Sequence, residues 1–193
     1  MTVNLGKGQQ VSLSKSDGGA LSVVRMGLGW QAAPRKGFLA KLMSRDIDLD
    51  ASAVLFAGQE PVDVVFFQQL ISKDGSVRHS GDNLVGGAGQ GGDDESITVD
   101  LRKVPADIDQ IVFTVNSFTG QTFAEVQNAF CRLVDESTGQ ELARYTLTGG
   151  GNATAQVMAK VQRSGGGWQM TAIGEPATGR TFQDLIPAIA SHL

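Results

Sequence analysis

The chain has 193 residues, of which 41% are hydrophobic and 19% charged, and its formal net charge is −4. This composition argues against intrinsic disorder, and the length fits one domain over residues 1–193. An acidic balance without a basic stripe disfavours nucleic acid as a partner. The 25 glycines against 5 prolines indicate tight turns between short strands, so we expect an all-β protein.

The chain start and the cysteine content bear on localisation. Residues 1–10 show no basic region followed by an apolar one, and no apolar run reaches the roughly 18 residues that a membrane span needs. Because Cys131 is the single cysteine, no internal disulfide can form. We therefore expect a soluble, cytoplasmic protein without a transmembrane segment.

In the N-terminal half, apolar patterns predict four strands. Residues 11–26 indicate two strands around a turn, a hairpin that Gly27-Leu28-Gly29-Trp30 ends. Residues 31–45 carry several basic side chains without a clear period, and we expect a loop there. Residues 51–56 and 62–67 are short runs rich in β-branched or aromatic residues, which predicts two buried strands.

In the C-terminal half, a long polar segment precedes further strands. Residues 72–96 are rich in glycine and long for a connection, unless a ligand orders them. The predicted strands are then 97–101 and 111–115, a hairpin of 130–134 with 141–145, and a hairpin of 155–161 with 168–173. Helix signals are short: a capping box begins at Thr122, and residues 181–190 have helical spacing that Pro187 weakens.

A row of acids precedes the first buried strand. In an extended chain Asp46, Asp48 and Asp50 share one face, while Ile47 and Leu49 face the core. Carboxylates this close repel one another, so either a multivalent cation or full solvation must relieve them. An EF-hand loop is excluded, because alanines occupy the positions of its glycine and its bidentate glutamate.

A second acidic cluster lies in residues 81–95. Asp82 and Asn83 stand at one end of a glycine loop, and Asp93, Asp94 and Glu95 stand at the other. Calcium takes six to eight oxygen ligands in flexible geometry, which suits this composition better than zinc would. An acidic surface loop is the alternative that residue chemistry leaves open.

Other site chemistries find little support. Residues 87–92 match G-x-G-x-x-G, but the acids that follow would repel phosphate. One cysteine and two histidines do not predict a catalytic triad. We expect Cys131 to be buried and structural, and His79 and His192 to be solvent-exposed.

Together these motifs resemble the TerD family of tellurium-resistance and stress-response proteins. The motifs occur in the family's order over nearly the whole chain. They are Gly27-Leu28-Gly29-Trp30, Asp48-Leu49-Asp50-Ala51-Ser52-Ala53, Gly81-Asp82-Asn83 through Gly92-Asp93-Asp94-Glu95, Phe113-Thr114-Val115-Asn116-Ser117, Arg132-Leu133-Val134-Asp135 and the Gly-Gly-Trp that ends at Trp168.

The resemblance implies a β-sandwich of two sheets with short peripheral helices and a calcium site. The metal ligands carried over are Asp82, Asn83, Asp93, Asp94 and Glu95, with Asp48, Asp50 and Asn116 as neighbours. Two positions depart from the family pattern: Gly81 and Gln31 stand where an Asn and an Asp are common.

The resemblance also implies a role in resistance to tellurite and other chemical stress. We expect a calcium-binding scaffold or sensor, not an enzyme, acting with other Ter-type proteins and a membrane component at the inner face of the membrane. The alternative is a metal-assisted hydrolase in which Glu95 or an Asp is the base. Direct tellurite chemistry would require reactive thiols, and Cys131 alone is a poor candidate.

Overall fold

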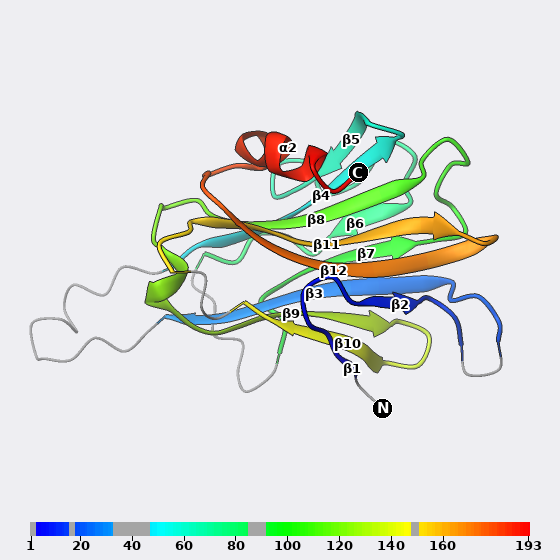
Figure 1. Cartoon of the computed structure of the whole chain (residues 1–193), viewed down its shortest axis with the longest axis horizontal. Coiled ribbons are helices and arrows are strands. Elements are labelled where there is room, and N and C mark those ends of the chain that lie inside the picture. Colours follow the sequence, from blue (N-terminus) through cyan, green and yellow to red (C-terminus); the bar gives the residue numbers. More distant parts are fainter. Residues whose placement is uncertain (1–2, 16–17, 33–46, 85–91, 148–150) are drawn as a thin grey trace, which may run out of the picture.

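The chain folds into a β-sandwich of two facing sheets (Figure 1). The computed structural model describes residues 3–15, 18–32, 47–84, 92–147 and 151–193. Within these residues each sheet has six strands, and all neighbouring strands run antiparallel except β1 and β10. The predicted all-β sandwich with short peripheral helices is confirmed.

The strands of sheet A, in spatial order, are β1 (Val3–Asn4), β10 (Gln140–Thr146), β9 (Val126–Asp135), β3 (Val23–Ala32), β7 (Glu95–Asp100) and β6 (Val77–His79). Those of sheet B are β2 (Gln10–Ser12), β12 (Gly167–Ala177), β11 (Ala155–Ser164), β8 (Gln110–Ser117), β4 (Leu49–Ala57) and β5 (Glu60–Val65). The helical elements among the described residues are a single 3₁₀ turn, η1 (Phe123–Glu125), and α2 (Phe182–Ala190).

Two apolar layers hold the sheets in place. The main core lies between the sheets and includes fully buried Trp30, Phe113 and Leu133. A smaller core forms on the outer face of sheet B, where Leu185 and Ile189 of α2 belong to one buried cluster with residues of β4, β8, β11 and β12. Strand β4 is therefore buried on both faces, which explains its nearly continuous apolar sequence.

Helix α2 continues through Pro187. A proline at this position removes the bond to the carbonyl of Gln183. Both residues are exposed, so the interrupted bond faces water. Thr181 and Asp184 form a capping box at the helix start, where Asp184 accepts the backbone N–H of Thr181.

Most predicted strands are confirmed, including the hairpins of β9 with β10 and of β11 with β12. The two strands and the turn predicted for the first hairpin are present, but the strands do not pair with each other, because β2 belongs to sheet B and β3 to sheet A. A bridge joins Ser14 and Ala20 at the turn, and the buried side chains of Leu13 and Leu21 then enter the core between the sheets. The segment is a corner between two sheets.

The second prediction to be corrected concerns residues 62–67. This region contributes to β5, an edge strand in which only Val65 is buried and the first three residues are exposed, and Phe66 and Phe67 lie beyond its end. The predicted basic loop lies largely outside the described residues, while Gln31 and Ala32 continue β3.

The Gly27-Leu28-Gly29-Trp30 motif lies inside β3, not at its end. Leu28 and Trp30 face the core, and the indole Nε1 of Trp30 donates to the carbonyl of Ile47 at 2.8 Å. The two glycines face outward, where a side chain would collide with the segment that follows residue 91. A Cβ on Gly27 would overlap the Asp93 carboxylate, and one on Gly29 would lie 2.8 Å from the Gly92 carbonyl.

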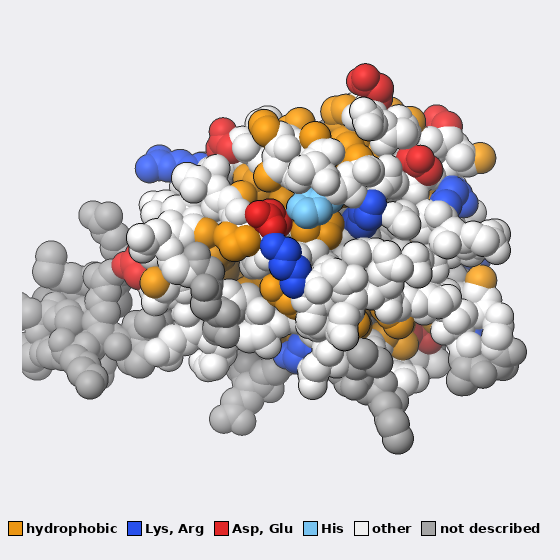
Figure 2. Space-filling view, viewed as in Figure 1, with side chains coloured by type: hydrophobic (Ala, Val, Ile, Leu, Met, Phe, Trp, Pro, Cys, Tyr) orange, Lys and Arg blue, Asp and Glu red, His pale blue; other side chains and the backbone are white. Residues whose placement is uncertain are grey.

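Charged side chains of both signs lie on the face of the sandwich that Figure 2 shows. Figure 2 shows acidic, histidine and basic side chains gathered near the centre of this face, with other charged side chains scattered among apolar and uncharged ones. The described side chains on it form no continuous basic area.

We predict that Gly29→Ala destabilises the protein by about 1–3 kcal/mol, because the new methyl group must displace the Phe130 ring, 2.6 Å away, or the Gly92 backbone. Gly167→Ala, also in a strand but with its nearest neighbour at 3.8 Å, is the matched control. It should be neutral or slightly stabilising. Urea denaturation measures both, and equal effects would show that the outward face of β3 has room.

Candidate metal centre

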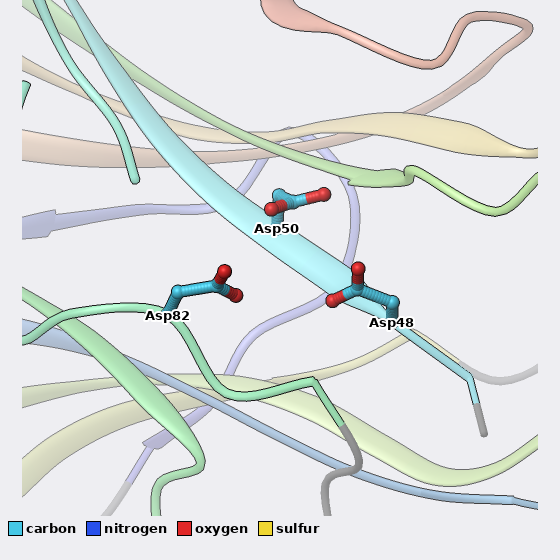
Figure 3. A group of neighbouring side chains, drawn as sticks. All are labelled: Asp48, Asp50 and Asp82. Carbon is cyan, nitrogen blue, oxygen red and sulfur yellow. The ribbon is translucent and has the colours of Figure 1, made fainter. Parts of the chain in front are cut away.

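Three carboxylates from two parts of the chain meet at one end of the sandwich. Asp48 precedes β4, Asp50 lies within it, and Asp82 lies in the loop between β6 and β7 (Figure 3). One oxygen from each lies within 4.8 Å of the others. Asp48 and Asp50 are 8% and 3% exposed, whereas Asp82 is on the surface.

Glu95 ties this site together from sheet A. It is the first residue of β7, and its side chain crosses to sheet B, where Oε2 accepts the backbone N–H of Ala51 at 2.9 Å. The other oxygen, Oε1, accepts the N–H of Asn83 at 3.1 Å. Strand β4 pairs with β5 from Ala53 onward. Glu95 thus satisfies a backbone donor in the part of β4 that β5 does not reach.

His79 was predicted to be solvent-exposed, and this is wrong: the residue is 7% exposed, in β6. Its Nδ1 accepts the N–H of Gly81 at 3.0 Å, so the ring proton lies on Nε2. Nε2 lies 3.2 Å from the carbonyl of Ala51 and 3.3 Å from Oε2 of Glu95. The alternation that places buried Val77 and His79 on the same strand face is the sequence signal that could have revealed it.

His79 and Glu95 together position Asp82. The residues on either side of Asp82 are Gly81, whose N–H is bound by His79, and Asn83, whose N–H is bound by Glu95. Two buried side chains therefore fix the short loop that brings the exposed carboxylate of Asp82 to those of Asp48 and Asp50.

The clustered charges change the acidity of the site. Burial raises the pKa of Asp50 to about 8, with a further contribution from the charges of Asp48, Glu95 and Asp82. Burial and the charges of Asp82 and Glu95 raise the pKa of Asp48 to about 6. Among the residues that the structure describes, Oδ1 of Asp48 is buried without a hydrogen-bond partner. Repelling carboxylates with an unsatisfied buried oxygen fit a cation.

Asp93, predicted as a ligand, is placed elsewhere. Its carboxylate pairs with Arg25, and also with Nε of Arg132 at 2.6 Å, over the outer face of β3 and β9. The structure does not bring it to the three carboxylates.

The remaining predicted ligands lie around the cluster. Oδ2 of Asp94 accepts the N–H of Trp30 at 2.8 Å, and Nδ2 of Asn83 lies 3.5 Å from Oδ1 of Asp94. Asn116 on β8 pairs in register with Asp50, and its Nδ2 lies 3.4 Å from Oδ2 of Asp50. Asp46 and residues 85–91, which include most of the glycine loop, lie outside the described residues.

Comparison with known proteins assigns the chain to a family. The family model described as the TerD domain matches residues 1–188. This chain belongs to the TerD family. It is 47% identical to the tellurium resistance protein TerZ of Serratia marcescens, with 98% of this chain and 97% of TerZ covered. It is 38% identical to the stress response protein SCP2 of Bacillus subtilis (strain 168), with 96% and 98% covered.

A solved structure supports the TerD fold. A homologue of the telluride resistance protein TerD from Streptomyces coelicolor A3(2) superposes with a TM-score of 0.73 at 21% identity, covering 89% of this chain and 98% of the homologue. In the described part of this TerD domain, no helix is long and apolar enough to cross a membrane.

The single thiol of this TerD domain is inert by position. Cys131 lies in β9 and is 1% exposed, and burial raises its pKa to about 12. Because the thiolate is the reactive form, direct thiol chemistry is disfavoured at neutral pH.

We predict that the ion-free TerD domain loses stability as pH rises from about 6 to 8. The folded pKa values of Asp48 and Asp50 exceed their ordinary value of 3.8, so the folded state binds more protons than the unfolded chain in this window. Urea denaturation in chelator at several pH values measures the slope. Asp50→Asn should reduce the loss of stability at the upper end of this pH range. Asp107→Asn should not, because Asp107 is exposed and lies outside the site. A stability that rises over this window would contradict the prediction.

Proposed function

We propose that this TerD domain binds Ca²⁺ through Asp48, Asp50 and Asp82 and serves, without catalysing a reaction, in tellurite resistance and the response to chemical stress. The observation that carries the calcium site is the meeting of these three carboxylates within 4.8 Å. The names of TerZ and SCP2 support the biological role.

The donor set favours calcium over other metals. All three donors are hard carboxylate oxygens, and His79 has both ring nitrogens engaged in the fold. Magnesium demands a compact octahedron and retains its water, whereas calcium accepts irregular geometry and more ligands. A surface carboxylate on a loop and two buried ones on a strand are an arrangement that calcium tolerates better.

A scaffold or sensor fits the site better than a hydrolase. Metal-assisted hydrolysis needs a base beside the ion, and the sequence candidates were Glu95 or an Asp. Both oxygens of Glu95 accept backbone N–H groups from Ala51 and Asn83, so its geometry serves the fold.

The proposed setting is the cytoplasm, in a complex with other Ter-type proteins and a membrane component at the inner face of the membrane. Exposed apolar side chains that a partner could cover are consistent with this proposal. Leu70 and Ile71 follow β5 and are 41% and 47% exposed, and Leu84 in the β6–β7 loop is 59% exposed.

We predict that calcium raises the free energy of unfolding by about 2.7 kcal/mol at a concentration 100 times its dissociation constant, because the ion binds the folded state. The same concentration of magnesium should give a smaller increase. Calorimetric titration of chelator-stripped protein and thermal melts measure affinity and stabilisation.

Variants locate this site. Combining Asp48→Asn and Asp50→Asn should abolish the calcium-dependent increase while stabilising the ion-free protein, because the cost of burying two ionisable groups among like charges is removed. Asp93→Asn is the control, since Asp93 pairs with Arg25 and Arg132. Its own melting temperature should fall, but the increase on adding calcium should persist. Loss of the calcium response in the control alone would move the site toward the glycine loop.

The biological role predicts a matching pattern in cells. In a tellurite-sensitive strain that lacks this protein, the wild type and Cys131→Ser should restore growth, because the thiol is buried. The Asp48 and Asp50 double variant should not. Growth curves with tellurite, together with immunoblots for protein level, measure this. A folded Cys131→Ser protein that fails to protect would reinstate thiol chemistry.

A further inference from the structure

A small cavity lies beside the carboxylates on the outer side of sheet B. Its volume is about 100 Å³, and its walls come from β4, β8, the turn after β5 and the start of α2. A volume of this size holds about three water molecules, or an organic group of four or five heavy atoms. The site described above uses Asp50 but not the rest of the cavity.

Four phenylalanine rings border this cavity. Phe182, Phe66, Phe67 and Phe118 follow one another with ring centroids 5.1, 5.4 and 5.8 Å apart. Phe118 is 46% exposed, although burying a ring of its size would stabilise the fold. The rings form one continuous aromatic wall that is open to solvent.

Two buried polar side chains, Asp50 and Asn116, are among the residues that line the cavity. Asn116 is 2% exposed, and its Nδ2 donates to the carbonyl of Arg180 at 2.5 Å and faces Oδ2 of Asp50 at 3.4 Å. The Arg180 carbonyl and Oδ2 of Asp50 are both acceptors, so Nδ2 and not Oδ1 of Asn116 must face them. Its Oδ1 is buried without a partner among the described residues.

Charge in the cavity has one sign. Asp50 is the only charged side chain among the described residues that line it. An aromatic wall, a carboxylate and an unsatisfied amide oxygen all favour a positively charged hydrogen-bond donor, since aromatic faces attract cations as well.

We infer that this cavity binds a small organic cation, an alkylammonium group. Its N–H groups donate to Asp50 and to Oδ1 of Asn116, and its carbon chain lies against the rings of Phe67 and Phe118. This binding does not require the calcium ion. Since both cations draw on Asp50, each weakens binding of the other by the same factor.

Three probes of equal length test the inference on chelator-stripped protein: n-butylammonium, 1-butanol and butyrate. Calorimetry, or NMR shifts of the Asn116 side-chain amide, should show n-butylammonium binding at least tenfold more tightly than the neutral and anionic probes. Equal binding of 1-butanol would show a general apolar surface and overturn the inference.

Two variants assign the contacts. Phe118→Ala, at an exposed position, and Asn116→Leu should each weaken binding of n-butylammonium at least fivefold. Phe130→Leu on β9, where Arg144 covers the ring, is the matched aromatic control and should bind as the wild type does. If the Phe118→Ala and Phe130→Leu variants bind n-butylammonium with equal affinity, the amine does not bind in this cavity. Calcium titration of the same sample tests the proposed function separately, whatever the amine does.

Discussion

The buried carboxylate of Glu95 is the constraint on which the site depends. An ionised group out of water is costly unless it is hydrogen-bonded. Glu95 meets this requirement with the N–H of Ala51 in sheet B and the N–H of Asn83 in the loop. His79 contributes from β6 by contacting both Ala51 and Glu95. The same hydrogen bonds therefore join the two sheets and hold Asp82 in position.

The outer face of β3 guides the chain into this arrangement. Gly27 and Gly29 leave space for the backbone of Gly92 and the side chain of Asp93, which two arginines hold in place. Asp94 then accepts the N–H of Trp30, and Glu95 turns inward. The consecutive residues Asp93, Asp94 and Glu95 thus have three different sets of partners. None of them belongs to the cluster of Asp48, Asp50 and Asp82.

Asp50 links the two ligands that we propose. It lies between the carboxylates of Asp48 and Asp82 on one side and the phenylalanine-lined cavity on the other. Its raised pKa reflects the cost of a buried charge among like charges, and either cation would reduce that cost. A TerD domain built in this way can make its response to calcium depend on a small amine.

The sequence alone determined the fold class, most strands and the acids of β4, because alternation in a strand places Asp48 and Asp50 on one face and Leu49 on the other. Composition also pointed to oxygen ligands and a buried thiol. Only the tertiary structure decided that Asp93 pairs with arginines, that His79 is buried, and that residues 11–26 turn a corner between sheets. These outcomes depend on contacts between residues far apart in the chain, such as Asp93 with Arg25, which a local pattern does not encode. The cavity beside Asp50 has the same origin, because β4, β8 and α2 meet there only after both sheets have formed.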